Sequence, residues 1–296
     1  MTAGGFERVL RLTPVDEETT PGAVRATLHW LGYAAARGGA VCVPVPAADG
    51  ALLHELADDG ERYLAVAYER APGRRAEEVP VGDWSDGALR ALGAAVGRLH
   101  AISAAYMPAD PRLLRPEWRA VGNCFRPDPL PASEGAVAAE AERRLAAVEA
   151  LPRERADYGL IHTDLHLGNV CLDEAVERVT ILDWDDCSYG WYAMDLALLL
   201  LDALVLCPPE GRPASGGRFL RHLLAGYRSE RALAPRVVLA LPRFLALLQA
   251  ALYTQVWAHR EGGDPWIDAF PTGRRERILA QAPYVDLGWE TLAGAT

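Results

Sequence analysis

Hydrophobic and polar residues alternate in several segments of the first part of the chain. Later in the chain, hydrophobic residues recur every three to four positions. Short alternating runs at residues 8–12, 41–45, 51–56 and 63–68 predict strands. The last two runs flank the turn-forming residues 58–60, which predicts an antiparallel pair.

One helix is expected within this β-rich part, at residues 21–37, where Pro and Gly open a stretch with apolar residues on one face. Residues 69–73, Glu-Arg-Ala-Pro-Gly, then interrupt the pattern, because Pro and Gly end regular elements. We therefore predict a small β-rich N-terminal lobe over residues 1–70 and a larger helical lobe over residues 71–296, joined by a hinge.

The second lobe is predicted to be mainly helical. Ser85 is a typical N-cap for a helix that runs to about residue 103. A proline-rich connection follows, with Trp118 as its anchor. The further elements are predicted in the order helix 134–150, hairpin 170–182, buried helix from about 192, loop 207–217, helices 218–228 and 235–260, and a final helix 274–281.

The residues that carry chemistry are concentrated in His162-Thr-Asp164-Leu-His-Leu-Gly-Asn169 and in the Asp183-Trp-Asp185 that ends the hairpin. Phosphoryl transfer needs one carboxylate to orient and deprotonate the attacking hydroxyl. It also needs an amide oxygen and a second carboxylate to hold Mg²⁺ against the nucleotide phosphates. The hairpin should bring Asp183 back beside Asn169. This order and spacing predict a kinase catalytic loop.

Two other interpretations of this segment are open. His162, Asp164 and His166 offer three metal donors within five residues. A metallohydrolase would need more ligands in the same place, whereas the other five histidines are scattered singly. The segment could also be a polar surface loop without chemistry.

Composition and charge narrow the class of protein. The chain of 296 residues is 50% hydrophobic and 24% charged, which is ordinary for a globular protein. Its net charge of −10 argues against a nucleic-acid partner and is compatible with a cationic small substrate. All 30 basic residues are Arg, so the chain contains no Lys.

The sequence predicts a cytoplasmic protein without a membrane partner. Its N-terminus lacks the basic and apolar regions of a signal peptide. The most apolar run, residues 193–207, is short and contains Asp195 and Asp202, which indicates a buried helix. Five Cys without paired spacing are typical of a reducing cytosol. The oligomeric state is not predicted.

Four segments in chain order are similar to one known family. They are Tyr68-Glu-Arg-Ala-Pro-Gly73, Leu92-Gly-x-x-x-Gly-Arg-Leu-His100, residues 158–169 with the catalytic motif, and residues 183–197 from Asp-Trp-Asp to Asp195-Leu-Ala. Together they resemble the aminoglycoside phosphotransferase and choline kinase-like family, especially its homoserine-kinase-like and stress-response-kinase-like branch. The resemblance implies an α+β, two-lobe protein-kinase-like fold, and it weakens after Leu206.

By position, the resemblance implies that Asp164 is the catalytic carboxylate and that Asn169 and Asp183 are the Mg²⁺ ligands. Asp185 is implied as an auxiliary ligand or a substrate contact. Asp195 is implied as the acid that holds the backbone of the catalytic loop.

The same resemblance implies structural roles for His100 and His162. The hinge backbone is the expected contact of the adenine ring, and it consists of Tyr68, Glu69, Arg70 and Ala71.

Several residues depart from the family pattern. Thr163 stands where Gly is usual, and Leu167 where Pro is usual. Arg11 occupies the place of the phosphate-binding Lys, and a guanidinium can hold a phosphate through two hydrogen bonds. Thr27 stands where the Glu partner of that Lys is expected, so nothing obvious orients Arg11. The phosphate-covering strands that usually precede it are expected to be largely missing, which gives a reduced N-terminal lobe.

The sequence therefore predicts an ATP-dependent, or GTP-dependent, phosphotransferase that uses Mg²⁺ to phosphorylate a hydroxyl of a small molecule, such as an antibiotic or a biosynthetic intermediate. A protein-kinase-like stress kinase and a catalytically weak nucleotide-binding pseudokinase are the alternatives. Acidic and aromatic side chains are the candidate substrate contacts: Asp185, Asp186, Trp191, Tyr253, Trp257, Glu261, Asp264 and Trp266.

Overall fold

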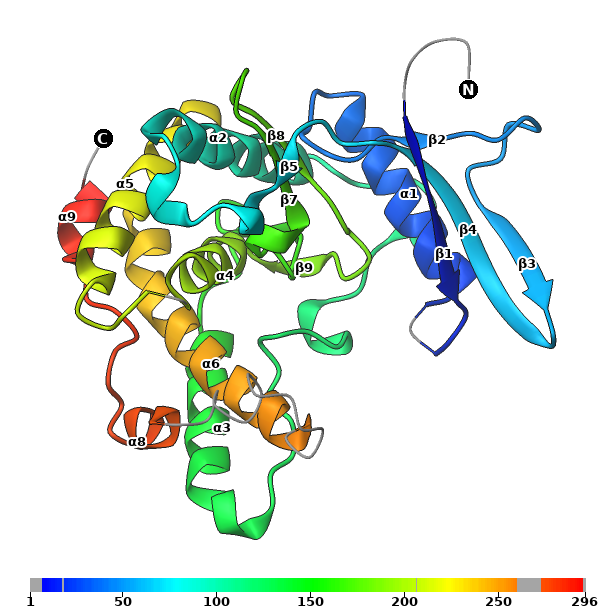
Figure 1. The fold of residues 1–296 in the computed structure, drawn as a ribbon. Coiled ribbons are helices and arrows are strands. Elements are labelled where there is room, and N and C mark those ends of the chain that lie inside the picture. Colours follow the sequence, from blue (N-terminus) through cyan, green and yellow to red (C-terminus); the bar gives the residue numbers. More distant parts are fainter. Residues whose placement is uncertain (1–6, 18, 206, 260–272, 295–296) are drawn as a thin grey trace.

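The structure is a computed structural model, and it describes residues 7–17, 19–205, 207–259 and 273–294. A four-stranded antiparallel sheet forms its N-terminal part (Figure 1). The strands are β1 (Arg8–Pro14), β2 (Pro44–Val45), β3 (His54–Asp58) and β4 (Glu61–Glu69). β4 pairs with β1 along one edge and with β2 and β3 along the other, which confirms the predicted antiparallel pair.

The predicted first helix is present as α1 (Pro21–Ala35). Thr20 caps it, because its hydroxyl accepts a hydrogen bond from the Ala23 amide over 3.1 Å, and Pro21 occupies the first turn, where no amide donor is needed. The helix lies against the N-terminal sheet (Figure 1).

Two small sheets connect this part to the helices. β5 (Arg74–Arg75), β7 (Val170–Asp173) and β8 (Arg178–Ile181) form one, and β6 (Tyr158–Ile161) pairs with β9 (Ser188–Trp191) in the other. The β7–β8 hairpin is the one the sequence predicts. β5, β6 and β9 are not predicted, because two to four residues show too little alternation.

The rest of the described chain is mainly helical, as predicted. Its helices are α2 (Asp86–Ser103), α3 (Gly135–Glu149), α4 (Tyr192–Val205), α5 (Arg212–Glu230), α6 (Pro235–His259), α8 (Arg274–Leu279) and α9 (Trp289–Gly294). Short 3₁₀ turns lie at Ala76–Glu78, Val81–Asp83, Pro111–Leu113, Trp118–Ala120, Ala132–Glu134 and Leu167–Asn169.

Four local predictions about this part can be compared with the structure. The Ser85 hydroxyl caps α2 by accepting from the Ala88 amide over 2.9 Å, and Trp118 is fully buried, so both predictions are confirmed. The loop predicted at residues 207–217 is shorter, because α5 already begins at Arg212. The helix predicted to end the chain is followed by a further short helix, α9.

Three glycines allow α2 and α5 to pack with their backbones in close contact. A Cβ on Gly93 would lie 1.9 Å from the Leu223 carbonyl oxygen, and one on Gly97 would lie 2.6 Å from that of Tyr227. From the opposite helix, a Cβ on Gly226 would lie 1.9 Å from the Arg90 carbonyl oxygen. The Gly-x-x-x-Gly spacing of α2 therefore has a packing reason.

α6 is a long and largely apolar helix. Residues 235–257 are long and apolar enough to cross a membrane by composition, but 67% of this stretch is buried inside the protein. Leu241, Phe244 and Leu248 are completely buried in the main core. The stretch therefore serves as a core helix in this fold.

Candidate active site

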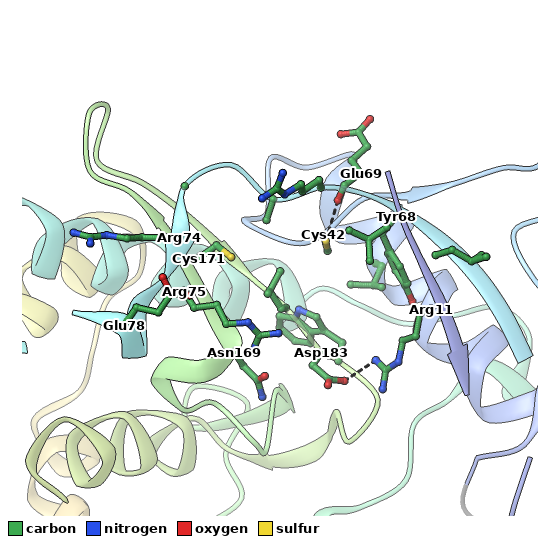
Figure 2. A pocket seen from close by; sticks show the side chains of 18 residues that line it. Arg11, Cys42, Tyr68, Glu69, Arg74, Arg75, Glu78, Asn169, Cys171 and Asp183 are labelled. Atoms are coloured by element: carbon green, nitrogen blue, oxygen red, sulfur yellow. Dashed lines mark hydrogen bonds and ion pairs between the residues drawn. The ribbon is translucent and has the colours of Figure 1, made fainter. Parts of the chain in front are cut away.

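A cavity of about 720 Å³ opens between β1, β4 and the β7–β8 hairpin (Figure 2). It is lined by residues of these strands and of the predicted hinge, among them Val9, Arg11, Cys42, Tyr68, Glu69, Arg70, Ala71, Arg75, Asn169, Cys171 and Asp183. A volume of this size is typical of cavities that bind nucleotide-sized ligands. The structure thus gathers the predicted nucleotide-binding and metal-binding residues on one cavity.

The hinge backbone is partly engaged within the protein. The Glu69 amide donates to the Val43 carbonyl over 2.9 Å, and the Arg70 amide donates to the Glu7 carbonyl over 3.0 Å. These two amides are therefore not available to a base. An adenine contact by the hinge backbone, which stays a prediction, would use carbonyl oxygens or Ala71.

Asn169 and Asp183 lie next to one another in this cavity (Figure 2). The Leu182 amide donates to the Asn169 carbonyl over 2.8 Å, so hairpin pairing sets their spacing, as predicted. The Asn169 side-chain nitrogen donates to the Asp164 carbonyl over 3.0 Å. This bond orients the amide, with its oxygen beside the Asp183 carboxylate, and such an oxygen pair is of the kind that suits Mg²⁺.

Asp164 lies at the outer side of the same loop, with its side chain 38% exposed. Its Oδ2 is 3.4 Å from the Asn169 side-chain nitrogen and 3.6 Å from His166 Nε2. The carboxylate is thus close to the proposed metal ligands and still accessible to an incoming hydroxyl.

Two carboxylates of α4 hold the catalytic loop by its backbone. Asp195, which is 1% exposed, accepts from the amides of His162 over 3.0 Å and Thr163 over 2.9 Å. Two turns further along the helix, the Asp202 carboxylate accepts a hydrogen bond from the Leu167 amide over 2.8 Å. The predicted role of Asp195 is confirmed, and His100 supports it with a hydrogen bond of 3.0 Å from Nε2.

This network also explains the charge states of its buried members. Burial lowers the pKa of His100, which the Asp195 carboxylate offsets only in part. Burial alone would raise the pKa of Asp195, but hydrogen bonds from His100 and the His162 amide hold it below its ordinary value. The pair therefore consists of a neutral His100 imidazole and an ionised Asp195 carboxylate. The second ring nitrogen of His100 is hydrogen-bonded to the Tyr227 hydroxyl over 3.0 Å.

Thr163 adopts a backbone conformation that favours glycine. Its φ is +75°, which is a strained value for a β-branched residue, and its side chain is completely buried. The Thr163 hydroxyl bonds to the Ser188 hydroxyl over 2.6 Å, and its amide bonds to Asp195. These bonds hold the conformation immediately before Asp164, so the usual glycine can be replaced here.

Arg11 points from β1 across the cavity toward the hairpin (Figure 2). Its Nη1 lies 2.8 Å from Asp183 Oδ1, and its Nη2 lies 2.7 Å from Asp185 Oδ2. Thr27 does not orient it, since the Thr27 hydroxyl donates to the Ala23 carbonyl of its own helix over 3.3 Å. The expectation that nothing orients Arg11 is therefore wrong.

Four carboxylates gather around the catalytic loop and the segment after β8. Burial raises the pKa of Asp186 to about 6, and repulsion from Asp164, Asp183 and Asp185 adds to this rise. Burial also raises the pKa of Asp185, although Arg11 opposes the shift. The site therefore carries excess negative charge that favours cationic ligands.

The metallohydrolase interpretation finds no support in the geometry. His162 Nε2 bonds to the Leu182 carbonyl over 2.7 Å, and His166 Nδ1 accepts from the Gly168 amide over 3.1 Å. Across the described residues, no group of three or more His, Cys, Asp and Glu side chains is arranged to hold a metal ion. His162 instead packs against Trp184, with ring centroids 4.7 Å apart, which fits a structural role.

Three of the predicted substrate contacts belong to apolar clusters of the fold. Trp191 is 3% exposed and donates to the Pro152 carbonyl over 2.9 Å, so it belongs to the core. Tyr253 is 1% exposed and stacks on the partly buried Trp257 in a second apolar cluster. Trp191 and Tyr253 are thus core side chains, because apolar faces of strands and helices are buried against their neighbours, and a substrate contact by Trp257 stays a prediction. Glu261, Asp264 and Trp266 lie outside the described residues.

Two residues that matter for the site are not among the site residues predicted from the sequence. Arg115 is buried and donates to the carbonyls of Asp185, Cys187 over 2.8 Å and Ala23 over 3.1 Å. It thereby ties α1 to the segment that follows β8, and no local pattern marks it. Asp202 could have been found, because it follows Asp195 by seven residues on an apolar helix and so shares its face.

Comparison with known proteins gives a consistent result. Residues 1–233 match the model of the phosphotransferase enzyme family. The amicoumacin kinase of Bacillus subtilis (strain 168) is 29% identical over 229 residues, which make up 76% of this chain and 67% of that protein. The chain thus spans about two thirds of the length of this relative.

Two solved structures share the fold. An amicoumacin kinase, hAmiN, in complex with AMP-PNP, Ca²⁺ and Ami, aligns with a TM-score of 0.85 at 27% identity over 96% of this chain and 85% of that one. A microcompartment-associated aminopropanol kinase aligns with a TM-score of 0.72 at 25% identity over 94% and 87% of the two chains. These similarities confirm the α+β, protein-kinase-like fold, and because the family model covers more than half of the chain, the protein belongs to the phosphotransferase enzyme family.

Proposed function

We propose that this protein is a kinase that transfers the γ-phosphoryl group of ATP, with Mg²⁺, to a hydroxyl of an amine-bearing small molecule. The observation that carries the proposal is that Asn169 and Asp183 line the 720 Å³ cavity together with the hinge, and that the Asp164 carboxylate lies 3.4 Å from the Asn169 side-chain nitrogen. Family membership and the AMP-PNP and Ca²⁺ bound by the hAmiN structure support it.

Asn169 and Asp183 would hold the metal through the amide oxygen and the carboxylate. The metal, when bound, neutralises charge on the nucleotide phosphates. Arg11 and the backbone amides of the cavity would contact the same phosphates. In this arrangement the γ-phosphorus would face the outer side of the loop, where Asp164 is accessible.

Asp164 would orient the acceptor hydroxyl and take its proton. A bond forms between the acceptor oxygen and the γ-phosphorus, while the bond between that phosphorus and the β–γ bridging oxygen breaks. The Asp195 and Asp202 contacts keep the loop backbone in place, so Asp164 needs little rearrangement to act.

The excess of carboxylates supports a cationic acceptor. Asp186 would be the side chain that meets an ammonium group, because Asp183 is assigned to the metal and Asp185 is paired with Arg11. The microcompartment-associated aminopropanol kinase, which is 25% identical, is named for a molecule that carries both a hydroxyl and an amine. We propose an antibiotic as the other acceptor class, and its modification would give resistance. The five cysteines are free thiols, and we place the activity in the cytoplasm.

The test is a phosphate-transfer panel with Mg-ATP and Mg-GTP. The acceptors are amicoumacin, aminopropanol and an aminoglycoside, and propanediol serves as a matched acceptor without the amine. We expect ADP release that depends on an amine-bearing acceptor and is lost in Asp164→Asn. Nucleotide binding by calorimetry without transfer to any acceptor would favour the pseudokinase alternative, and absence of nucleotide binding would contradict the proposal.

A further inference from the structure

The Arg11 guanidinium is shared between two carboxylates of one short segment. Nη1 pairs with Asp183 at 2.8 Å and Nη2 pairs with Asp185 at 2.7 Å, so each nitrogen of the fork has a different partner. The planar fork of Arg permits this geometry, whereas a single ammonium could not place two separate nitrogens. The two carboxylates are two residues apart. They differ because Asp183 is also a proposed metal ligand, whereas Asp185 is not.

The two ends of this bridge are held by independent structure. Arg11 is opposite Val66 in the seven-residue pairing of β1 with β4, which fixes the base of its side chain. The backbone of Asp185 is held by Arg115, which also bonds to the Cys187 carbonyl over 2.8 Å. Asp185 is therefore a fixed partner for Arg11, independent of whether the cavity contains a ligand.

Asp183 differs from Asp185 because it is the proposed metal ligand. A divalent cation on Asp183 would lie within a few ångströms of the Arg11 guanidinium, and the two positive charges would repel one another. A nucleotide removes this conflict, since its phosphates attract both cations.

We propose that Arg11 is a switched counter-ion: it neutralises Asp183 while the site holds no nucleotide, and Asp185 keeps it in place for the phosphates when Asp183 binds the metal. Asp185 is then a positioning residue that takes the place of the missing Glu partner. The proposal rests on the proposed function and adds that metal and nucleotide each strengthen the binding of the other.

The first test measures Mn²⁺ binding to the nucleotide-free protein by electron paramagnetic resonance. We expect Arg11→Ala to raise Mn²⁺ affinity about tenfold, from the repulsion of a double and a single charge about 5 Å apart at nearly water-like screening. Arg11→Lys keeps the charge and should stay near wild type. Arg8→Ala removes an exposed charge from the same strand and is the matched control.

The second test measures the affinity for Mg-AMP-PNP by calorimetry in a double-mutant cycle. Asp185→Asn should weaken binding about tenfold when Arg11 is present and have little further effect in Arg11→Ala, because the residue acts through Arg11. Equal losses in both backgrounds would show that Asp185 binds metal or nucleotide directly and would overturn its positioning role.

The two tests also separate this inference from the proposed function. If Arg11→Ala left nucleotide-free Mn²⁺ affinity unchanged while the wild type bound Mg-AMP-PNP, the counter-ion role would be wrong and the kinase proposal would stand. If Mn²⁺ affinity rose in Arg11→Ala but the wild type bound no nucleotide, the exchange between Asp183 and the phosphates would be refuted together with the kinase proposal.

Discussion

Replacement of Asp195 by Asn should be the most damaging single-atom change near the catalytic loop. The carboxylate accepts from two loop amides and from His100 at 2.9–3.0 Å, and it is 1% exposed. The amide of Asn offers one acceptor oxygen and one NH₂ group, so in either orientation the NH₂ group faces a buried N–H donor. With hydrogen bonds to charged groups worth about 1.5–3 kcal/mol each, we expect a loss of about 3–5 kcal/mol in the free energy of unfolding.

Asp202→Asn is the matched control, because Asp202 is on the same helix and accepts a hydrogen bond from one loop amide, that of Leu167, at 2.8 Å. Its loss should be about 1–2 kcal/mol. Urea unfolding, followed by circular dichroism, measures both. Equal costs of the two variants, or a cost below about 1 kcal/mol for Asp195→Asn, would refute the view that this carboxylate organises the loop.

The same network predicts a dependence of stability on pH. The folded pKa of His100 is lowered, so below its unfolded pKa of about 6.5 the unfolded state binds a proton that the folded state does not. Stability should thus fall on acidification from pH 7.5 to 5.5, by up to about 1.4 kcal/mol from this group. The lowered pKa of Asp195 acts in the same direction, but only near and below about pH 4. His100→Gln should flatten the profile above pH 5.5, and an unchanged slope would contradict the assignment.

Four further outcomes are expected. Asp164→Asn should reduce turnover by about 10²–10⁴-fold while AMP-PNP affinity stays close to wild type, and near-normal turnover in the coupled assay would exclude its role as base. Asp183→Ala should make AMP-PNP affinity independent of Mg²⁺, and a preserved Mg²⁺ dependence in calorimetry would contradict the metal assignment. Gly93→Ala should destabilise by about 1–3 kcal/mol or more, because the added Cβ would lie 1.9 Å from the Leu223 carbonyl oxygen. Gly32→Ala is at a helical position where the added Cβ would have no atom within 4 Å beyond its chain neighbours and its own helix backbone. It should instead stabilise by about 0.5–1 kcal/mol in the same urea assay, and a loss there would contradict the packing argument.

The sequence alone was sufficient for the local part of this site. Asn169 and Asp183 are joined by a single hairpin, and the pairing of β7 with β8 depends on residues only a few positions apart. The Ser85 cap of α2 is equally local. Such features are predictable because neighbouring residues determine them through turn geometry and alternation. The family resemblance added the expected roles of Asp164 and the hinge.

The tertiary structure decided which distant side chains meet. The partners of Arg11 lie 172 and 174 positions further along the chain, and only the packing of β1 over the hairpin brings them together. Trp191 shows the converse, since an aromatic residue near the motif is buried in the core. Spacing along a sequence indicates which residues share an element. The relative placement of elements follows from the burial of their apolar faces, and this burial depends on the whole chain at once.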